Sequence, residues 1–425
     1  MHPIRFIHAA DLHLDAAFSG LSRDIPAEFA ERLRTATFTA FRRLLDLCER
    51  ASPDFLLLAG DVYNQEDASV SAQLALRDGF RRLESLSIPV FLVHGNHDPL
   101  ASRLRSVRWP GNVTVFGELP DAVPVFRKGE ETPLAIIHGA SHASGRETRN
   151  LAALFRRTEA CGLHVGLLHA TPGDADGVAR YAPFSQEDLK ASGMDYWALG
   201  HIHDRREVCR EPLAAYPGCT QGLHINEPGE KGCLLVTAEA RPDGGYAVRT
   251  SFRPLGPAVW KTLDMDLGGA ASLDELENRL RTGLDRAAAE VWSGCEMLLV
   301  RLRLQGRTEL DGLLRKGTTC AELADRLRED GSGVPRIWIK DIDVATRPCV
   351  ERGALLERED LLGEVFRLSE AARTASGLQA LREGPLAPLF AHARAGKALE
   401  PLTDEELARL LDDAESLCLD LLEND

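Results

Sequence analysis

The 425-residue sequence lacks the long apolar runs of a membrane protein. Its longest runs, such as Phe55 to Ala59 and Cys233 to Val236, are far shorter than the roughly 20 residues that cross a bilayer. The first residues also lack the basic segment and apolar stretch of a secretory signal. We therefore expect a cytoplasmic protein with no membrane span.

Cysteine is present but follows no recognisable pattern. The nine cysteines are an odd number, and no two of them form a Cys-x-x-Cys pair. This argues against a disulfide framework and against a zinc site made of thiolates. We expect reduced thiols, most of them buried.

Positive charge is also scarce. The 50 Lys and Arg against 65 Asp and Glu give a net charge of −15, the opposite of what general attraction to DNA requires. Any contact with nucleic acid must therefore be local. Bound divalent cations would supply part of the missing positive charge.

The first part of the chain has the pattern of an α/β layered domain. Residues 1 to about 240 alternate short apolar runs with amphipathic stretches. Strands are expected at Ile4–Ala9, Phe55–Ala59, Val90–Val93, Leu134–Ile137, Val165–Leu168, Tyr196–Ala198 and Cys233–Val236. Helices are expected at Pro26–Glu49 and Ser69–Leu86.

The pattern changes at Trp260. Strands are expected at Lys261–Met265, Glu296–Leu304 and Arg336–Val344, and a helix at Leu273–Glu290, which predicts a small α+β unit. From Cys349 onward the pattern is helical. The last 25 residues carry nine acidic side chains against one arginine, but their leucines form an apolar stripe. We expect this segment to dock on a partner or on the chain's own domain.

Polar motifs stand directly after five of the expected strands. They are Asp11-Leu12-His13, Gly60-Asp61, Gly95-Asn96-His97-Asp98, His169, and Gly200-His201-Ile202-His203. In α/β folds, ligands bind at the carboxyl ends of the strands. In extended backbone, residues two apart point to the same side, so Asp11 and His13 are expected to approach one ion, and the His-x-His pair likewise.

Each motif has an ordinary structural explanation when it is taken alone. A single buried histidine is usually hydrogen-bonded, and Gly-Asp or Gly-Asn usually marks a turn. Together the motifs supply carboxylate, imidazole and amide ligands but no thiolate. That set suits a pair of ions such as manganese or iron better than a sulfur-bound zinc. We therefore expect a site for two metal ions.

The order of the motifs, DxH, GDxxx, GNHD, H and GHxH, resembles the calcineurin-like metallophosphoesterase superfamily. The stretch from Pro217-Gly218-Cys219 to Glu230-Lys231-Gly232 and the small following domain look like the SbcD and YhaO branch of DNA repair exonucleases. Glu66-Asp67, followed by Gln73, is similar to YhaO-type proteins. The resemblance covers roughly residues 1 to 350.

The resemblance implies an α/β fold with a layered core of two β-sheets flanked by helices, a small α+β capping domain and a helical C-terminal tail. It implies a catalytic domain at residues 1–255, a capping domain that binds DNA at 256–348, and a partner-docking region at 349–425.

The resemblance also implies roles for the motif residues. One metal would be held by Asp11, His13, Asp61 and His203, and the other by Asp61, Asn96, His169 and His201, with Asp61 as the bridge. Mn²⁺ is the expected ion, with Fe²⁺ and Mg²⁺ as alternatives. His97 would lie over the scissile phosphate. Because an imidazole titrates near neutral pH, this residue is expected to protonate or stabilise the departing oxygen. Asp98 is a candidate to orient that imidazole, with a solvated carboxylate or a helix cap as the alternatives.

One position departs from the family pattern. Several DNA nucleases of the superfamily have a histidine three residues after the bridging aspartate, where this chain has Asn64. That difference puts the nuclease rate in doubt but leaves the metal set complete. Candidate phosphate contacts are Arg103 and Arg105, after the GNHD motif, and Arg205, after the GHxH motif.

The resemblance therefore favours a manganese-dependent DNA exonuclease or endonuclease subunit. It would work in DNA repair with an SbcC-like or YhaN-like coiled-coil ATPase, and a homodimer is also suggested. A small-substrate phosphodiesterase or phosphatase is the first alternative, although it would not need the region from Trp260 to Thr346. A structural subunit of a repair ATPase with little catalysis is the second, and Asn64 keeps it open.

Overall fold

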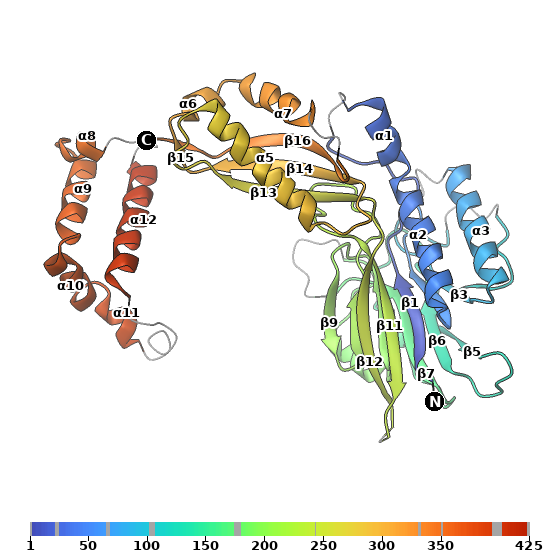
Figure 1. Cartoon of the computed structure of the whole chain (residues 1–425). Coiled ribbons are helices and arrows are strands. Elements are labelled where there is room, and N and C mark those ends of the chain that lie inside the picture. The colour runs from blue at the N-terminus through green and yellow to red at the C-terminus, as the bar shows by residue number, and fades with distance from the viewer. Residues whose placement is uncertain are drawn as a thin grey trace. The chain divides into compact units, whose positions relative to one another are not determined.

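A computed structural model describes residues 2–21, 25–64, 69–101, 107–173, 180–242, 244–329, 333–349, 352–392 and 402–422. The chain forms two compact units (Figure 1). The first comprises Met1–Asp266, Asp274–Leu304 and Arg315–Ala345, and the second comprises Leu267–Leu273, Gln305–Leu314 and Thr346–Asp425. The three expected domains at 1–255, 256–348 and 349–425 stay a prediction.

The first sheet of the larger unit has a parallel centre. Its strands run in the order β12-β11-β1-β2-β3-β4, and β1 to β4 are parallel. The strands are β1 (Ile4–Ala9), β2 (Phe55–Ala59), β3 (Val90–Val93), β4 (Val113–Val115), β11 (Gly232–Ala240) and β12 (Tyr246–Pro254). The carboxyl ends of β1, β2 and β3 therefore meet at one edge of the sheet.

The second sheet is also parallel at its centre. Its order is β5-β6-β7-β8-β10-β9, with β6, β7, β8 and β10 parallel. The strands are β5 (Asp121–Val125), β6 (Ala135–Ala140), β7 (Leu163–His169), β8 (Tyr196–Gly200), β9 (Arg206–Arg210) and β10 (Leu213–Tyr216).

The two sheets pack face to face. Phe6 of β1 stacks on Phe55 of β2 at 4.7 Å and meets the edge of Tyr196 from β8 at 5.5 Å between ring centroids. Along β2, Leu57 belongs to this inner core, whereas Leu56 belongs to the core on the opposite face. A strand buried on both faces must be apolar throughout, which explains the uninterrupted run in β2.

Helices cover the outer faces of both sheets. On the first sheet lie α2 (Ala36–Ala51) and α3 (Val70–Ser85), which bury Leu44 and Leu76 against it (Figure 1). On the second sheet lie the single turn η1 (Ala152–Leu154) and α4 (Gln186–Ala191). The result is a four-layer core of helices, sheet, sheet and helices.

The helix expected at Pro26–Glu49 is wrong as one element. The structure has α1 (Ala27–Arg34) and α2, with a break at Thr35. The Thr35 hydroxyl donates to the carbonyl oxygens of Glu31 and Arg32, at 3.1 and 3.3 Å. Such side-chain bonds compete with regular helix geometry.

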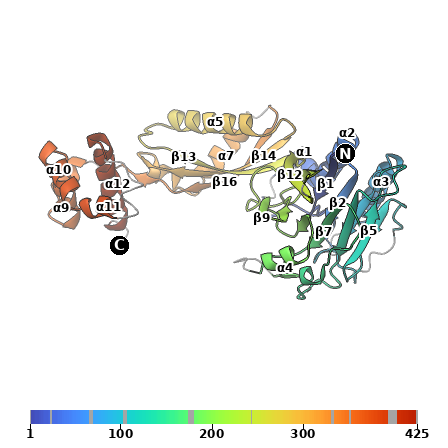
Figure 2. The ribbon, with the colours of Figure 1, turned by 90° about the horizontal axis from the view of Figure 1, so that it is seen from below.

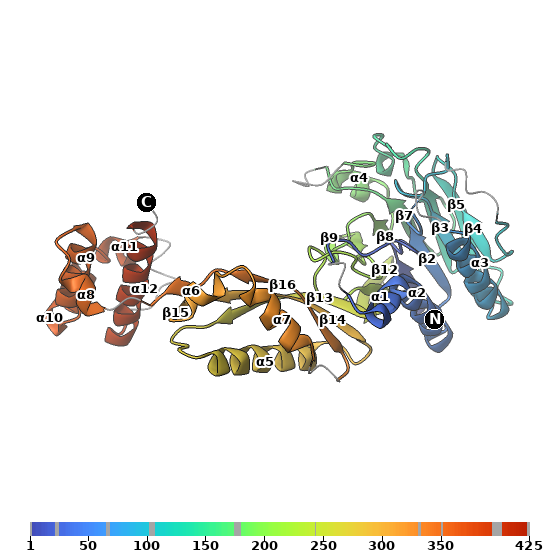
Figure 3. The same ribbon diagram turned by 90° about the horizontal axis from the view of Figure 1, so that it is seen from above.

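A small three-stranded sheet belongs to the same unit. It contains β13 (Ala258–Asp266), β14 (Met297–Gln305) and β16 (Arg336–Val344), and α7 (Thr319–Glu329) packs near β16. Along one face of the sheet lies α5 (Leu273–Glu290) (Figure 2). The buried side chains of α5 recur at helical spacing. Next to the sheet lies α1 (Figure 3). Phe29 of α1 contacts Trp338 of β16 at 5.6 Å between ring centroids.

The second unit is mostly helical. It contains α6 (Asp311–Leu314), α8 (Arg352–Leu356), α9 (Leu361–Ala372), α10 (Ala375–Glu383), α11 (Ala387–Ala391), α12 (Asp404–Leu422) and the short strands β15 (Arg307–Thr308) and β17 (Arg347–Pro348). Leu419 of α12 packs with Phe366 of α9, and Arg352 pairs with the buried Glu415 at 2.7 Å. The leucine stripe is only partly covered, because Leu417 and Leu421 are exposed.

The fold class expected from the sequence is confirmed. Every expected strand is present, and β1, β2, β3 and β16 have the expected bounds. The strands that were not expected are β4, β5, β9, β10, β12 and the two-residue strands β15 and β17. Most residues of β4, β5, β9 and β12 are partly exposed, so these strands lack a long apolar run. Among the described residues, no helix is both long and apolar enough to cross a membrane.

The inner core predicts a specific loss of stability. Leu57→Ala should lower the free energy of unfolding by about 3 kcal/mol, because it leaves a cavity between the two sheets. Chemical denaturation followed by circular dichroism measures this loss. Leu119→Ala, at a side chain that is 57% exposed, should change stability by less than about 0.5 kcal/mol. Equal losses in the two variants would contradict the assignment of the core.

Candidate metal centre

The five motifs lie on loops that meet at one edge of the two sheets. Backbone bonds join these loops directly: Asp11 N donates to Gly60 O at 3.1 Å, and Ala170 N donates to Gly200 O at 3.1 Å. The meeting of the loops follows from the parallel strands, whose carboxyl ends share one edge in each sheet.

Several of the expected ligands have an unusual backbone conformation. The φ angles are 51° at Asp11, 42° at His13, 49° at Asp61 and 103° at His201. Positive φ is uncommon for residues other than glycine, and it concentrates at functional sites. The extended backbone expected for Asp11-Leu12-His13 is therefore wrong, although the two side chains do come together. Loop conformation, not strand alternation, directs them to one side.

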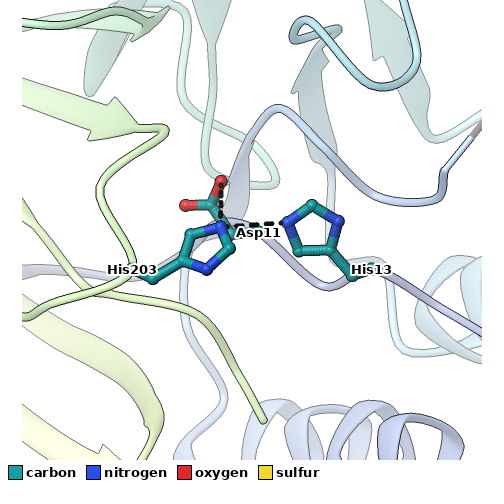
Figure 4. A group of neighbouring side chains, drawn as sticks. All are labelled: Asp11, His13 and His203. Atoms are coloured by element: carbon teal, nitrogen blue, oxygen red, sulfur yellow. Dashed lines mark hydrogen bonds and ion pairs between the residues drawn. The ribbon is translucent and has the colours of Figure 1, made fainter. Parts of the chain in front are cut away.

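The first ligand group consists of Asp11, His13 and His203 (Figure 4). His13 Nε2 lies 3.1 Å from His203 Nε2, and His203 Nε2 lies 3.9 Å from Asp11 Oδ1. One donor atom from each residue falls within 4.8 Å of the others. Two imidazole nitrogens and a carboxylate oxygen therefore point at a common space.

The second group consists of Asp61, His169 and His201, with the amide of Asn96 among them. His169 Nε2 lies 3.3 Å from Asp61 Oδ2 and 3.0 Å from Asn96 Oδ1. His201 Nδ1 lies 3.1 Å from the same amide oxygen. The structure thus brings all seven expected ligands into two adjacent clusters.

The electrostatics of these clusters fit bound cations. Burial raises the pKa of the Asp11 carboxyl, because the ionised form loses its hydration. Burial acts the same way on Asp61, but His169, His13 and His97 together outweigh it and lower the pKa of Asp61. Burial disfavours the charged form of His169, yet Asp61 raises its pKa to about 9. Two divalent cations would balance these carboxylates, and the oxygen and nitrogen donors suit them.

The histidines are held from behind by a second set of contacts. His13 Nδ1 lies 2.6 Å from Asn64 Oδ1, and His169 Nδ1 lies 2.9 Å from the carbonyl oxygen of Ala59. An acceptor at one ring nitrogen fixes the proton there and leaves the other nitrogen free to bind a metal. Asn64, which the sequence marks only as a departure from the family, therefore has a place in the centre.

Glu227 was not expected from the sequence. Its Oε1 lies 2.5 Å from His203 Nδ1, although the two residues are 24 positions apart. Burial opposes the ionised form of Glu227, but His203 lowers its pKa to about 2. Cys219 lies in the same cluster, but burial raises the pKa of its thiol well above the usual value. Burial therefore favours the neutral form of the Cys219 thiol.

His97 and Asp98 have different surroundings. His97 is exposed, its ring lies 5.3 Å from that of His13, and its backbone N donates to Asp61 Oδ1 at 2.9 Å. The buried Asp98 accepts from the backbone N of Gly95 at 2.7 Å and of Val62 at 3.0 Å. These contacts join the loop of the GNHD motif to the loop that carries Asp61. From the sequence, Asp98 was a candidate to orient His97.

Of the expected phosphate contacts, Arg103 and Arg105 lie outside the described residues. Arg205 is exposed, and its guanidinium stacks over the ring of Phe252 at 4.0 Å. Next to it, Arg206 lies over Tyr216 at 5.6 Å. The two arginines line a hollow of about 280 Å³ on the surface near the GHxH loop.

Comparisons with known proteins agree with this geometry. Residues 4–205 match the family of calcineurin-like phosphoesterases, and residues 260–347 match the middle domain of the metallophosphoesterase YhaO. The uncharacterized metallophosphoesterase YhaO of Bacillus subtilis is 34% identical over 388 residues, which cover 90% of this chain and 91% of that protein.

More distant relatives carry the name DNA double-strand break repair protein Mre11. The protein of Aeropyrum pernix is 26% identical and covers 68% of this chain and 69% of its own length. That of Methanopyrus kandleri is 22% identical, with coverages of 77% and 79%. The chain thus belongs to the calcineurin-like metallophosphoesterases, and within them it carries the YhaO middle domain. It is a metal-dependent phosphoesterase with a dinuclear centre for divalent ions.

The close packing around Gly95 gives a test of the centre. A Cβ atom at position 95 would lie 2.3 Å from Asp61 Oδ1 and 2.8 Å from the ring of His169. Gly95→Ala should therefore separate these ligands and lower the bound metal to less than half of the wild-type amount, measured by elemental analysis after dialysis. Gly117→Ala, where a Cβ meets nothing within 4 Å, should keep the wild-type metal content. Full metal content in Gly95→Ala would contradict the ligand assignment.

Proposed function

We propose that this chain is the nuclease subunit of a DNA repair complex and hydrolyses phosphodiester bonds in DNA. The observation that carries the proposal is the pair of ligand clusters at the sheet edge, with the exposed His97 beside them. Support for DNA as the substrate comes from the relatives named Mre11 and from the arginines beside the GHxH loop.

The proposed ligand sets share one residue. Asp11, His13, Asp61 and His203 would hold one ion, and Asp61, Asn96, His169 and His201 the other, with Asp61 as the bridge. Asp61 suits this role because the rings of His13 and His169, one from each set, both act on its charge. We propose Mn²⁺ as the ion, with Fe²⁺ and Mg²⁺ as alternatives, because every donor is an oxygen or an imidazole nitrogen.

Two bound cations would lower the pKa of a water molecule and hold the phosphate for in-line attack. The protein's own part is to place the remaining groups. His97 is close to His13 yet open to solvent, so its imidazole can give a proton to the departing oxygen. Its backbone bond to Asp61 fixes the loop relative to the metal ligands. The carboxylate of Asp98 stabilises the same loop by accepting bonds from the backbone N of Gly95 and of Val62.

The substrate surface would extend from the centre to the arginine hollow. Arg205 stacks on Phe252, so its side chain is held in place before a phosphate arrives. A net charge of −15 requires phosphate contacts to be local, and two adjacent arginines beside the metal loops meet that requirement. The small sheet of β13, β14 and β16 would act as the capping domain that binds DNA.

The partner would be an SbcC-like or YhaN-like coiled-coil ATPase. The helical second unit exposes large apolar side chains, among them Leu361, Leu368, Leu417 and Leu421. Apolar groups on a helical surface suit a helical partner, because both lose contact with water on association. We also propose a homodimer, which the resemblance suggests.

His97→Ala tests the catalytic assignment. The variant should cleave linear duplex DNA, single-stranded DNA and bis-p-nitrophenyl phosphate roughly 10²–10⁴-fold more slowly than wild type in Mn²⁺. Its metal content should not change, since His97 lies beside the ligand clusters rather than in them. Wild-type cleavage of the small ester alone would show a small-substrate phosphodiesterase. No hydrolysis by a metal-loaded wild type would show a structural subunit.

Arg205→Ala tests the DNA surface. Loss of one phosphate contact should weaken DNA binding and reduce the slope of log K against log salt by about 1. Hydrolysis of the small ester should stay at the wild-type rate. Arg81→Ala on α3, at a side chain that is 59% exposed, is the matched control and should leave the slope unchanged. The same slope in wild type and Arg205→Ala would remove Arg205 from the DNA surface.

A further inference from the structure

Glu227 stands directly behind one metal-facing histidine. Its Oε1 is 2.5 Å from His203 Nδ1, and its Oε2 accepts a bond from the backbone N of Leu223 at 2.7 Å. Both carboxylate oxygens are therefore engaged, and the side chain of Glu227 is only 21% exposed. A carboxylate held in this way has little freedom to turn away from the imidazole.

This contact determines which nitrogen of His203 faces the metal position. The carboxylate accepts the proton of Nδ1, so Nε2 keeps its lone pair and points toward His13 and Asp11, at 3.1 and 3.9 Å. A carboxylate behind a ligating histidine fixes its orientation and makes it a stronger donor. Glu227 has the geometry of such a partner.

The outer partners of the histidines are not equivalent. His13 contacts the neutral amide of Asn64, and His169 contacts the neutral carbonyl of Ala59. Of these three histidines, only His203 has a carboxylate behind it. The position formed by Asp11, His13 and His203 therefore has a carboxylate behind one of its histidines. In the other position, the partner behind His169 is a neutral carbonyl.

The loop that carries Glu227 is firmly held. The ammonium group of Lys231, a residue that is 5% exposed, donates to the carbonyl oxygen of His203 at 3.0 Å. Gly229 N donates to the carbonyl oxygen of Trp260 at 2.9 Å, and Trp260 Nε1 donates to the carbonyl oxygen of Gly222 at 3.0 Å. The segment from 222 to 231 is thus fastened both to the GHxH loop and to β13.

We propose that Glu227 is a positioning residue that selectively strengthens the metal position formed by Asp11, His13 and His203. The two positions of the centre would then differ in affinity, and the difference would depend on Glu227. This proposal rests on the dinuclear centre of the proposed function but not on DNA as the substrate. Metal binding, not cleavage, therefore tests it.

The test is a calorimetric titration of metal-free protein with Mn²⁺, combined with elemental analysis. Wild type should bind two ions per chain. Glu227→Gln, which keeps the size of the side chain but removes its charge, should keep one site at wild-type affinity and weaken the other about 10–100-fold. Glu227→Asp keeps the charge on a shorter side chain and should recover part of the loss.

The matched control is Glu230→Gln. Glu230 lies three residues further along the same loop, is exposed, and accepts a bond from the backbone N of Trp292 at 3.0 Å. The Glu230→Gln variant should bind both ions with wild-type affinity. Circular dichroism of the metal-free variants checks that they fold. If Glu227→Gln does not fold, the titration of Glu227→Asp tests the proposal instead.

The outcomes separate the two proposals. Two wild-type affinities in Glu227→Gln would overturn the role of Glu227 and leave the dinuclear centre intact. Equal weakening of both sites would overturn the selectivity. No Mn²⁺ binding by the wild type would overturn the dinuclear centre, and with it the proposed function.

Discussion

The centre of this protein depends on two carboxylates, Asp11 and Asp61, that are buried where the two sheets meet. Removing a charge from water costs free energy unless an opposite charge or hydrogen bonds replace the lost hydration. Around these two residues the replacements are imidazoles and backbone N–H groups. The positive φ angles at Asp11 and Asp61 serve the same end, because they turn the side chains inward from the strand ends.

A metal centre built in this way is part of the fold as well as of the chemistry. Cations that bind only the folded chain stabilise it by mass action. Without cations, the charge of the buried carboxylates would have to be balanced by protonated histidines, as in the pair of Asp61 and His169. The arrangement also explains why Gly95 has no side chain, since a Cβ atom would occupy the space that Asp61 and His169 need.

The elements that could be predicted from the sequence are those whose residue pattern follows from burial alone. The run Phe55–Ala59 is apolar because β2 is buried on both faces, and the pattern shows this without any structure. The seven proposed ligands could be singled out because their motifs follow such runs. The break at Thr35 was missed, since one hydroxyl bonding back to the helix does not alter the apolar pattern. The strands β4, β5, β9 and β12 were missed because most of their residues are partly exposed, so the sequence shows no long apolar run there.

The outer contacts of the centre could not be predicted from the sequence. Glu227 and His203 are 24 residues apart in different loops, and no spacing rule relates them. Asp98 stands beside His97 in the sequence, yet its carboxylate bonds to the backbone of two metal loops. Neighbours in the sequence suggest partners, but the direction of each side chain depends on backbone angles that the pattern does not contain. Asp11 and His13 illustrate this, because their approach was expected for the wrong reason.

The attachment of the Glu227 loop to β13 has a thermodynamic consequence. Gly229 and Trp260 link the small sheet to the residue behind His203, so a ligand that shifts this sheet also shifts a support of one metal. Coupling of this kind is reciprocal: whatever factor the metal contributes to the affinity of that ligand, the ligand returns to the affinity of the metal. Binding of metal at the centre and binding of a ligand at the small sheet would then be linked steps of one equilibrium.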